Sequence, residues 1–236
     1  MRPWSDRPIQ DCLESLEHLP PQLFRIEPHP YASIGAPYGP GGDPFRLRSG
    51  VVRRLLEAQD QLRNNAPELQ FAIFDAWRPI SVQAFMVNYT IDQLCQERGV
   101  ERHDPAQQAA LHQVEVDVAR FWAAPSRNPE TPPPHSTGAA VDLTLATGTG
   151  TLLPMGGDID AIGAVSEPDY YANATNTEAK IFHQRRNLLR SVMASVGFIQ
   201  HPNEWWHYSY GDQLWAWRSG AECAIYAEAG SRSATA

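Results

Sequence analysis

Residues 135–145 read HSTGAAVDLTL and predict a tight turn followed by a strand. Residues 132–134 are three prolines, which rule out a helix and hold the chain extended, and Gly138 then allows the turn. From Ala139 to Leu145, the alternation and the β-branched side chains favour a strand. Asp142 lies in that strand between apolar neighbours, where a carboxylate is costly unless it is paired or bound to a metal.

A second segment, residues 204–207, reads EWWH and supplies another imidazole and another carboxylate. His135, Asp142 and His207 together offer two imidazoles and one carboxylate, a ligand set that suits Zn²⁺. Three protein ligands with a fourth position left for water are typical of catalytic zinc, whereas structural zinc sites usually have four ligands and are rich in Cys. On spacing alone, ordinary hydrogen-bonded side chains explain these residues as well as metal binding does. The six other histidines are assigned to that ordinary class: His18, His29, His103, His112, His183 and His201.

Longer strings resemble a known family. They are DAWRP at 75–79, VDLTL at 141–145, PMG at 154–156, QRRNLLRS at 184–191 and the stretch from Gly197 to Tyr208. In order and spacing, residues 31–208 resemble the zinc peptidases that cleave D-alanyl and bacterial cell-wall peptides, and among them the D-alanyl-D-alanine dipeptidases of the vancomycin-resistance type. The resemblance implies one zinc ion per chain, bound by His135, Asp142 and His207. It also implies hydrolysis of a small dipeptide substrate, D-alanyl-D-alanine.

Some positions depart from the family pattern. Pro133 and Pro134 stand where the family commonly has Ser, so any hydrogen bond from those hydroxyls to the substrate is lost. Trp77 stands where the DxYRP segment of the family has Tyr. Asp160 keeps an acid that the family usually flanks with an aromatic residue, but its neighbours here are aliphatic and predict a smaller pocket wall. The metal chemistry therefore follows from the pattern more directly than the substrate does.

Glu204 is the candidate catalytic base. Zinc lowers the pKa of bound water towards 7, and peptide hydrolysis then needs a group that takes the water proton and delivers it to the leaving amine. Residues three apart in a strand point to opposite faces, so Glu204 and His207 share a face only if Glu204 lies at a turn near residues 202–203. The competing interpretation is a surface acid. Of the two tryptophans between them, one is expected in the core and the other beside the cleft.

Arg78 and Asp160 are the other candidate site residues. Arg78 lies just after a predicted strand and directly before Pro79, so the backbone at this corner is expected to be rigid. A cation fixed there would stabilise the oxyanion that forms at the scissile carbonyl. An ion pair with Asp75 is the competing interpretation, and both hold if Asp75 orients Arg78. The resemblance implies that Asp160 binds the amine of the substrate, which would explain a limit to dipeptides.

Composition excludes several classes of partner. The net charge of −8 argues against nucleic acid, because no basic face is available to neutralise phosphates. No stretch approaches the length of about 20 apolar residues that a membrane span needs, and no apolar targeting segment is evident at the start of the sequence. Cys12, Cys95 and Cys223 lie far apart, a pattern that favours free thiols in a reducing compartment. We therefore expect a cytoplasmic protein, and its oligomeric state is left open.

Helical and strand patterns occur in separate runs, which predicts an α+β fold with one small, mostly antiparallel central sheet, helices packed around it and zinc in a cleft. Residues 1–48 are rich in Pro and Gly and are expected to form an arm of loops within the same domain as the catalytic residues 49–236. Helices are predicted at 50–64 with Ser49 as N-cap, 80–98 before Gly99, 104–123 with Asp104 as N-cap, and 177–195. Strands are predicted at 69–74, 139–145, 198–199 and 205–210, with an irregular stretch at 155–177 and a frayed end at 228–236.

Two alternatives remain open. The first is a D,D-carboxypeptidase or cell-wall endopeptidase of the same superfamily, which would need an open groove instead of a closed cleft that captures a free amine. The second is a zinc-bound binding module without catalytic activity. Glu204 and Arg78, retained together with all three ligands, argue against the second alternative.

Overall fold

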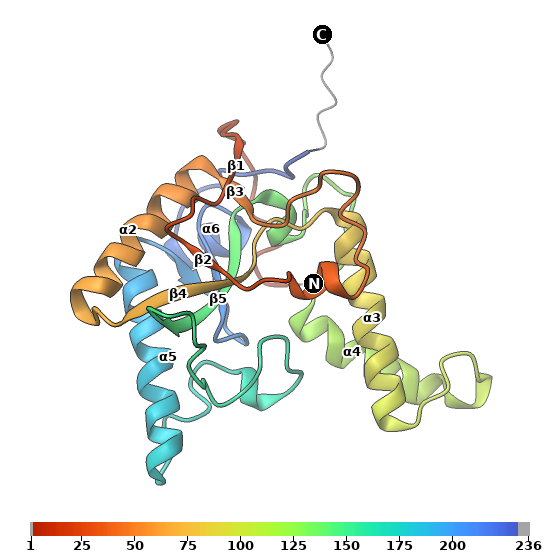
Figure 1. Ribbon diagram of the computed structural model, residues 1–236. Coiled ribbons are helices and arrows are strands. Elements are labelled where there is room, and N and C mark those ends of the chain that lie inside the picture. The colour runs from red at the N-terminus through yellow and green to blue at the C-terminus, as the bar shows by residue number, and fades with distance from the viewer. Residues whose placement is uncertain (1, 231–236) are drawn as a thin grey trace.

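A five-stranded sheet crosses the middle of the protein in the computed structural model, which describes residues 2–230 (Figure 1). The strand order is β2 (Phe24–Arg25), β4 (Leu69–Asp75), β5 (Ala140–Thr147), β7 (His207–Ser209) and β6 (Ile199–Gln200). The β2–β4 pair is parallel and the other three pairs of neighbours are antiparallel, so the predicted, mostly antiparallel sheet is confirmed. The middle strand, β5, is buried at every position but its last, which accounts for its nearly continuous apolar sequence.

The helices form two groups, and one of them covers the sheet. The elements are α1 (Pro30–Ser33), α2 (Ser49–Asn65), α3 (Ile80–Arg98), the 3₁₀ turn η1 (Pro105–Gln107), α4 (Gln108–Phe121), η2 (Pro134–Thr137), η3 (Ala164–Ser166), α5 (Thr177–Ser195) and α6 (Gln213–Ser219). Helices α2 and α5 pack together against the sheet and share its main apolar core, which confirms the α+β prediction. Helices α3 and α4 pair with each other around a second apolar cluster.

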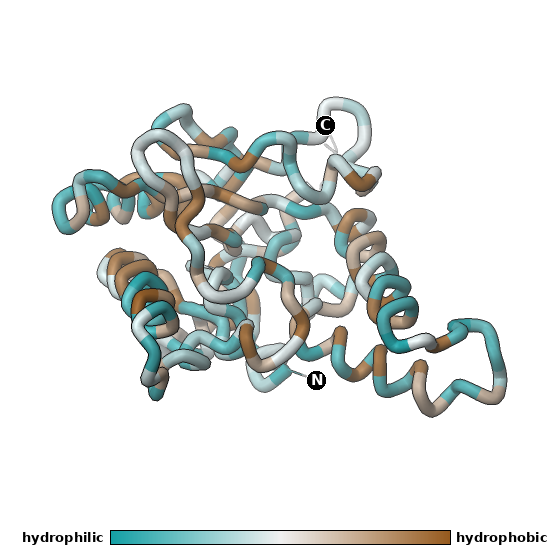
Figure 2. Tube along the Cα trace, turned by 60° about the horizontal axis from the view of Figure 1, so that its bottom comes forward, coloured by the Kyte–Doolittle hydropathy of each residue, from teal (hydrophilic) through white to brown (hydrophobic). Residues whose placement is uncertain are grey.

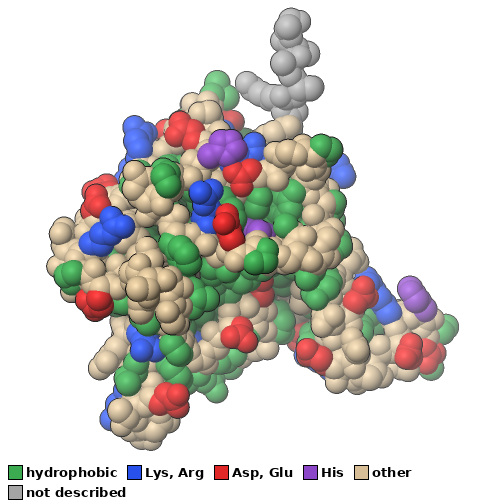
Figure 3. Space-filling view, in the orientation of Figure 1, with side chains coloured by type: hydrophobic (Ala, Val, Ile, Leu, Met, Phe, Trp, Pro, Cys, Tyr) green, Lys and Arg blue, Asp and Glu red, His purple; other side chains and the backbone are tan. Residues whose placement is uncertain are grey.

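The α3–α4 pair projects from the body of the molecule (Figures 1 and 3). Its far end is hydrophilic, and acidic and basic side chains gather there (Figures 2 and 3). Helix α3 ends at Gly99, which adopts a left-handed conformation with φ of 64°, as predicted. None of the helices in the described part of the chain combines the length and the apolar content that crossing a lipid bilayer requires.

The arm of residues 1–48 contains more regular structure than predicted. Its strand β1 (Leu16–His18) pairs with β3 (Arg46–Arg48), and β2 joins the central sheet. These strands are two or three residues long and depend on partners far along the chain, so local sequence patterns carry little sign of them.

The predicted N-cap of α2 was wrong. Ser49 is the first residue of the helix and Arg48 is the cap, without a side-chain hydrogen bond. Instead the Gly50 amide donates to Glu14 Oε2 at 2.6 Å, so a carboxylate of the arm satisfies a free amide at the helix start.

Two further predictions need correction. The segment 104–123 is not one helix, because Asp104 caps the 3₁₀ turn η1 and α4 follows it from Gln108 to Phe121. The predicted frayed end at 228–236 begins too early: α6 follows its N-cap Asp212, and beyond it the Ala229 amide donates to the Ser136 carbonyl at 2.8 Å. Residues 228–230 of the predicted frayed end therefore pack against the body, and residues 231–236 lie outside the described part.

Candidate active site

Two carboxylates and one imidazole form one row across the sheet. Asp142 on β5 lies directly opposite His207 on β7, and on its other side it lies opposite Asp75 on β4. An irregularity of the β4–β5 register between Ile73 and Asp75 brings Asp75 into this row. Because directly opposite residues of neighbouring strands point to the same face, Asp142 and His207 meet on one side of the sheet.

His135 completes a cluster of three metal-ligand side chains. It belongs to η2, just before the left-handed Gly138 that turns the chain into β5. His135 Nε2 lies 3.2 Å from Asp142 Oδ2 and 3.2 Å from His207 Nδ1, and His207 Nδ1 lies 3.0 Å from Asp142 Oδ1. All three side chains are buried. The three predicted ligands therefore converge on one point.

The surroundings hold these ligands in the form that binds a cation. His135 Nδ1 is 2.7 Å from the Ala76 carbonyl, so it donates its proton there and leaves the Nε2 lone pair facing the cluster. Burial alone would raise the pKa of Asp142, but His135 and His207 outweigh it and hold the pKa well below its usual range. Asp142 is therefore ionised at neutral pH.

Glu204 lies beside the ligand cluster without belonging to it. It follows the turn at Pro202-Asn203 and precedes β7, which is the position predicted from the spacing. Its Oε2 is 3.8 Å from His207 Nδ1, and its Oε1 is 3.1 Å from His201 Nδ1. Burial and the charge of Asp142 raise the pKa of Glu204 to about 8. Oε1 has no hydrogen-bond partner among the described residues, so this buried oxygen is available to a molecule in the cleft.

Arg78 is fixed by a buried network. Its Nε and Nη2 donate to Asp75 Oδ2 at 3.0 and 2.7 Å, and its Nη1 donates to Gln83 Oε1 at 2.9 Å. Nη2 also lies 3.4 Å from Asp142 Oδ2, so the guanidinium borders the ligand cluster. Burial would lower the pKa of Arg78, but Asp75 outweighs it and keeps the group charged. Arg78 is thus both paired with Asp75 and placed beside the ligand cluster, so the two interpretations given for it hold together.

Asp160 reaches the same cleft from the irregular stretch after β5. Its Oδ2 accepts a hydrogen bond of 2.6 Å from the Tyr31 hydroxyl, and burial together with the charge of Asp142 raises its pKa to about 7. Arg186 of α5 anchors this stretch, because its guanidinium donates to the carbonyls of Met155, Val165 and Glu167 at 2.8–3.0 Å.

A small cleft of about 30 Å³ brings these groups together. All six site residues predicted from the sequence line it: Arg78, His135, Asp142, Asp160, Glu204 and His207. Trp205 and Trp206 are both buried in the main core; Trp206 also lines this cleft, as expected for one of the pair, and Trp205 packs against Arg186.

Several side chains that contact the site were not singled out from the sequence. Tyr31 links Asp160 to Arg78, since its ring also lies 4.9 Å from the Arg78 guanidinium carbon. His29 Nε2 is 3.1 Å from Asp75 Oδ1, and His201 Nδ1 lies 3.1 Å from Glu204 Oε1, so two histidines assigned to the ordinary class are neighbours of site residues. Arg2 also lines the cleft. No local pattern marks these residues, because they come from segments far from the motifs.

The chain is similar to several known proteins. The family described as D-Ala-D-Ala dipeptidase, Peptidase_M15, matches residues 24–224. A D-alanyl-D-alanine dipeptidase of Synechocystis sp. is 42% identical over 92% of this chain and 90% of its own length. The D-alanyl-D-alanine dipeptidase of Escherichia coli is 30% identical over 59% of this chain and 54% of its own length. Among solved structures, a Zn(II) complex of the vancomycin resistance D,D-pentapeptidase VanY matches with a TM-score of 0.47 and 15% identity, over 94% of this chain and 97% of that one.

Proposed function

Because this chain belongs to the D-alanyl-D-alanine dipeptidase family, we propose that it hydrolyses the peptide bond of D-alanyl-D-alanine with one zinc ion held by His135, Asp142 and His207. The observation that carries the proposal is the convergence of these three side chains, whose nitrogen and carboxylate oxygen atoms lie 3.0–3.2 Å from one another, beside the buried carboxylate of Glu204, which is not one of them.

The residues present fit a zinc ion. In a tetrahedral zinc site with bonds of about 2.0–2.2 Å, neighbouring ligand atoms lie about 3.3–3.6 Å apart. The contacts between the three side chains, 3.0–3.2 Å, are slightly shorter than that, and two imidazoles with one carboxylate match catalytic zinc sites. Zinc bound there would supply Lewis acidity, which polarises a peptide carbonyl and makes water a stronger acid.

The side chains around the cluster supply proton transfer, oxyanion stabilisation and substrate binding. Glu204 takes the proton from the attacking water and returns it to the leaving amine, a role that its place next to His207 supports. Arg78, held by Asp75, stabilises the negative charge that develops on the carbonyl oxygen. Asp160 binds the free ammonium group of the dipeptide, and the Tyr31 hydroxyl, which donates to Asp160, holds the Asp160 carboxylate in position.

The same geometry favours a dipeptidase over its alternatives. A dipeptidase needs a group that captures a free amine, and the partly buried carboxylate of Asp160 lies in the cleft beside the ligand cluster, where it can do so. A binding module without activity would have no use for a buried acid beside the ligands. The arm of residues 1–48 belongs to the same functional unit, because Tyr31 and Arg2 border the cleft. Cys12, Cys95 and Cys223 form no disulfide, and we place the protein in the cytoplasm because free thiols persist in a reducing compartment.

A panel of four peptides tests the substrate assignment. We expect rapid hydrolysis of D-Ala-D-Ala and slow hydrolysis of L-Ala-L-Ala, N-acetyl-D-Ala-D-Ala and a tripeptide that ends in D-Ala. Asp160→Asn should raise KM for D-Ala-D-Ala, because the contact between Asp160 and the ammonium group is lost. It should leave the slow rate on the N-acetyl compound nearly unchanged, because that compound has no ammonium group for Asp160 to bind. Equal rates of the wild-type protein on the free and N-acetylated dipeptides would instead assign it as a carboxypeptidase.

A further inference from the structure

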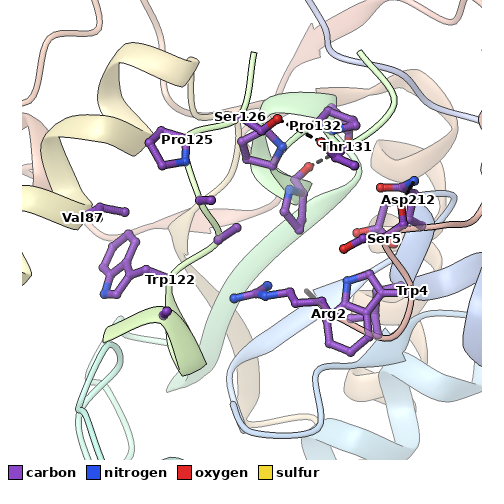
Figure 4. Close-up of a pocket in the computed structure, with 18 of the residues that line it drawn as sticks. Arg2, Trp4, Ser5, Val87, Trp122, Pro125, Ser126, Thr131, Pro132 and Asp212 are labelled. Carbon is purple, nitrogen blue, oxygen red and sulfur yellow. Dashed lines mark hydrogen bonds between the residues drawn. The ribbon is translucent and has the colours of Figure 1, made fainter. Parts of the chain in front are cut away.

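A larger cavity of about 700 Å³ adjoins the catalytic cleft. Four residues line both spaces: Arg2, Trp122, Ala123 and Pro134. Figure 4 shows this cavity with the Arg2 side chain extended across it towards Trp122. The cleft itself has room for about two water molecules, so a dipeptide bound at the ligand cluster must extend to this border.

The segment that carries Arg2 is held against the body of the protein by contacts of residues 4–7. Trp4 is buried and packs its ring edge-on against His201, with the ring centres 5.6 Å apart. The Gln213 side-chain amide donates to the carbonyls of Arg7 at 2.6 Å and Ser5 at 3.3 Å, which ties the segment to α6. Arg2 therefore has a defined place at the border.

Arg2 makes no ion pair with the described residues in this position. Its Nη2 donates to the Phe121 carbonyl at 3.1 Å, and no carboxylate of the described residues lies within ion-pair distance of it. Arg78, by contrast, is fully engaged with Asp75 and Gln83. Apart from Arg2, the ionisable side chains that line the larger cavity are the acids Glu115 and Asp212 and the phenol of Tyr226, so Arg2 is its only cationic group among the described residues. Because a partly buried cation without a partner is costly, the arrangement suits an anion that arrives with the substrate.

We propose that Arg2 binds the C-terminal carboxylate of the dipeptide and is a specificity-determining residue of this enzyme. The inference rests on the proposed function and extends it, since a dipeptide presents an ammonium group to Asp160 and a carboxylate that needs a partner of its own. Pro133 and Pro134 line the same region and have no hydroxyl to offer that carboxylate. Arg2 supplies the donor that those positions lack.

The charge of Arg2 also interacts with that of Glu204. A role in which Arg2 acts on the catalytic acid instead of the substrate predicts different kinetics. A carboxylate-binding residue changes KM, and only for substrates that carry the carboxylate. A residue that acts through Glu204 changes kcat for every substrate.

The test compares D-Ala-D-Ala with its C-terminal amide, D-alanyl-D-alaninamide, in four proteins: wild type, Arg2→Gln, Arg2→Lys and the control Arg7→Gln. Arg7 lies in the same segment and lines neither space, so its replacement removes one positive charge without touching the border. We expect Arg2→Gln to lower kcat/KM for the free acid by about 10- to 100-fold, mainly through KM, as for the loss of a hydrogen bond to a charged group. The rate on the amide should change little, Arg2→Lys should keep part of the preference for the acid, and Arg7→Gln should behave as wild type.

Calorimetry gives a second readout that does not need turnover. In a Glu204→Gln background, adding Arg2→Gln should weaken the binding of D-Ala-D-Ala by a similar factor and leave that of the amide unchanged. Unchanged discrimination between acid and amide in Arg2→Gln, or a fall in kcat alone for both compounds, would overturn the inference. If the wild-type protein hydrolyses neither compound, the proposed function fails, and the calorimetric comparison still decides the role of Arg2.

Discussion

Replacement of Glu204 by Gln is expected to lower the turnover of D-Ala-D-Ala by about 10²- to 10⁴-fold, the usual contribution of a positioned acid–base group. Gln keeps the size and the polarity of the side chain but cannot accept a proton. Since Glu204 is not one of the three converging ligands, zinc content and fold should stay as in the wild type.

Metal analysis, circular dichroism and steady-state kinetics on the same preparation check this result. Glu204→Ala serves as a companion variant, because added small carboxylates can enter the space it leaves and partly restore turnover. The same acids should not rescue Arg78→Ala, in which a cation is missing. Turnover near the wild-type rate in Glu204→Gln, with normal zinc content, would remove Glu204 from the mechanism.

The zinc ligands give the second large effect. His135→Ala and Asp142→Asn should each purify with well under one zinc ion per chain and with no measurable turnover, because two protein ligands bind zinc far more weakly than three. His18→Ala is the matched control: that imidazole is exposed, pairs with Asp43 and lies outside the cluster. Full zinc content in both ligand variants would place the metal elsewhere. Circular dichroism must accompany the measurement, since Asp142 also contacts the buried Arg78.

The parts of the site that the sequence predicts are those encoded in short strings. The turn at Gly138, the strand that carries Asp142 and the turn before His207 each follow from local residue preferences, and the structure contains all three. The resemblance to a family then connects these strings, which local patterns cannot do. The row formed by Asp75, Asp142 and His207 depends on strand register and on an irregularity in β4, and neither can be read from the sequence alone.

The missed features have identifiable physical causes. Helix α6 is short, and the signals at its ends, Asp212 as N-cap and Gly220 in a left-handed conformation, are the marks that would have revealed it. The predicted cap at Ser49 followed the usual preference for Ser, but a tertiary contact from Glu14 takes that role. Arg2 reaches the cleft only because Trp4 and Gln213 seat its segment against distant elements. Such long-range packing leaves no periodic trace in the sequence.

Metal removal and return is the most direct test of zinc-dependent dipeptide hydrolysis at the cluster of His135, Asp142 and His207. The protein would be stripped with a chelator, dialysed, and titrated with Zn²⁺ while the release of D-Ala from D-Ala-D-Ala is measured. We expect no turnover without metal, a linear return of activity on addition of zinc, and a plateau at one equivalent per chain. Full turnover in the stripped protein, or zinc binding at one equivalent with no hydrolysis of D-Ala-D-Ala, would contradict the proposed function.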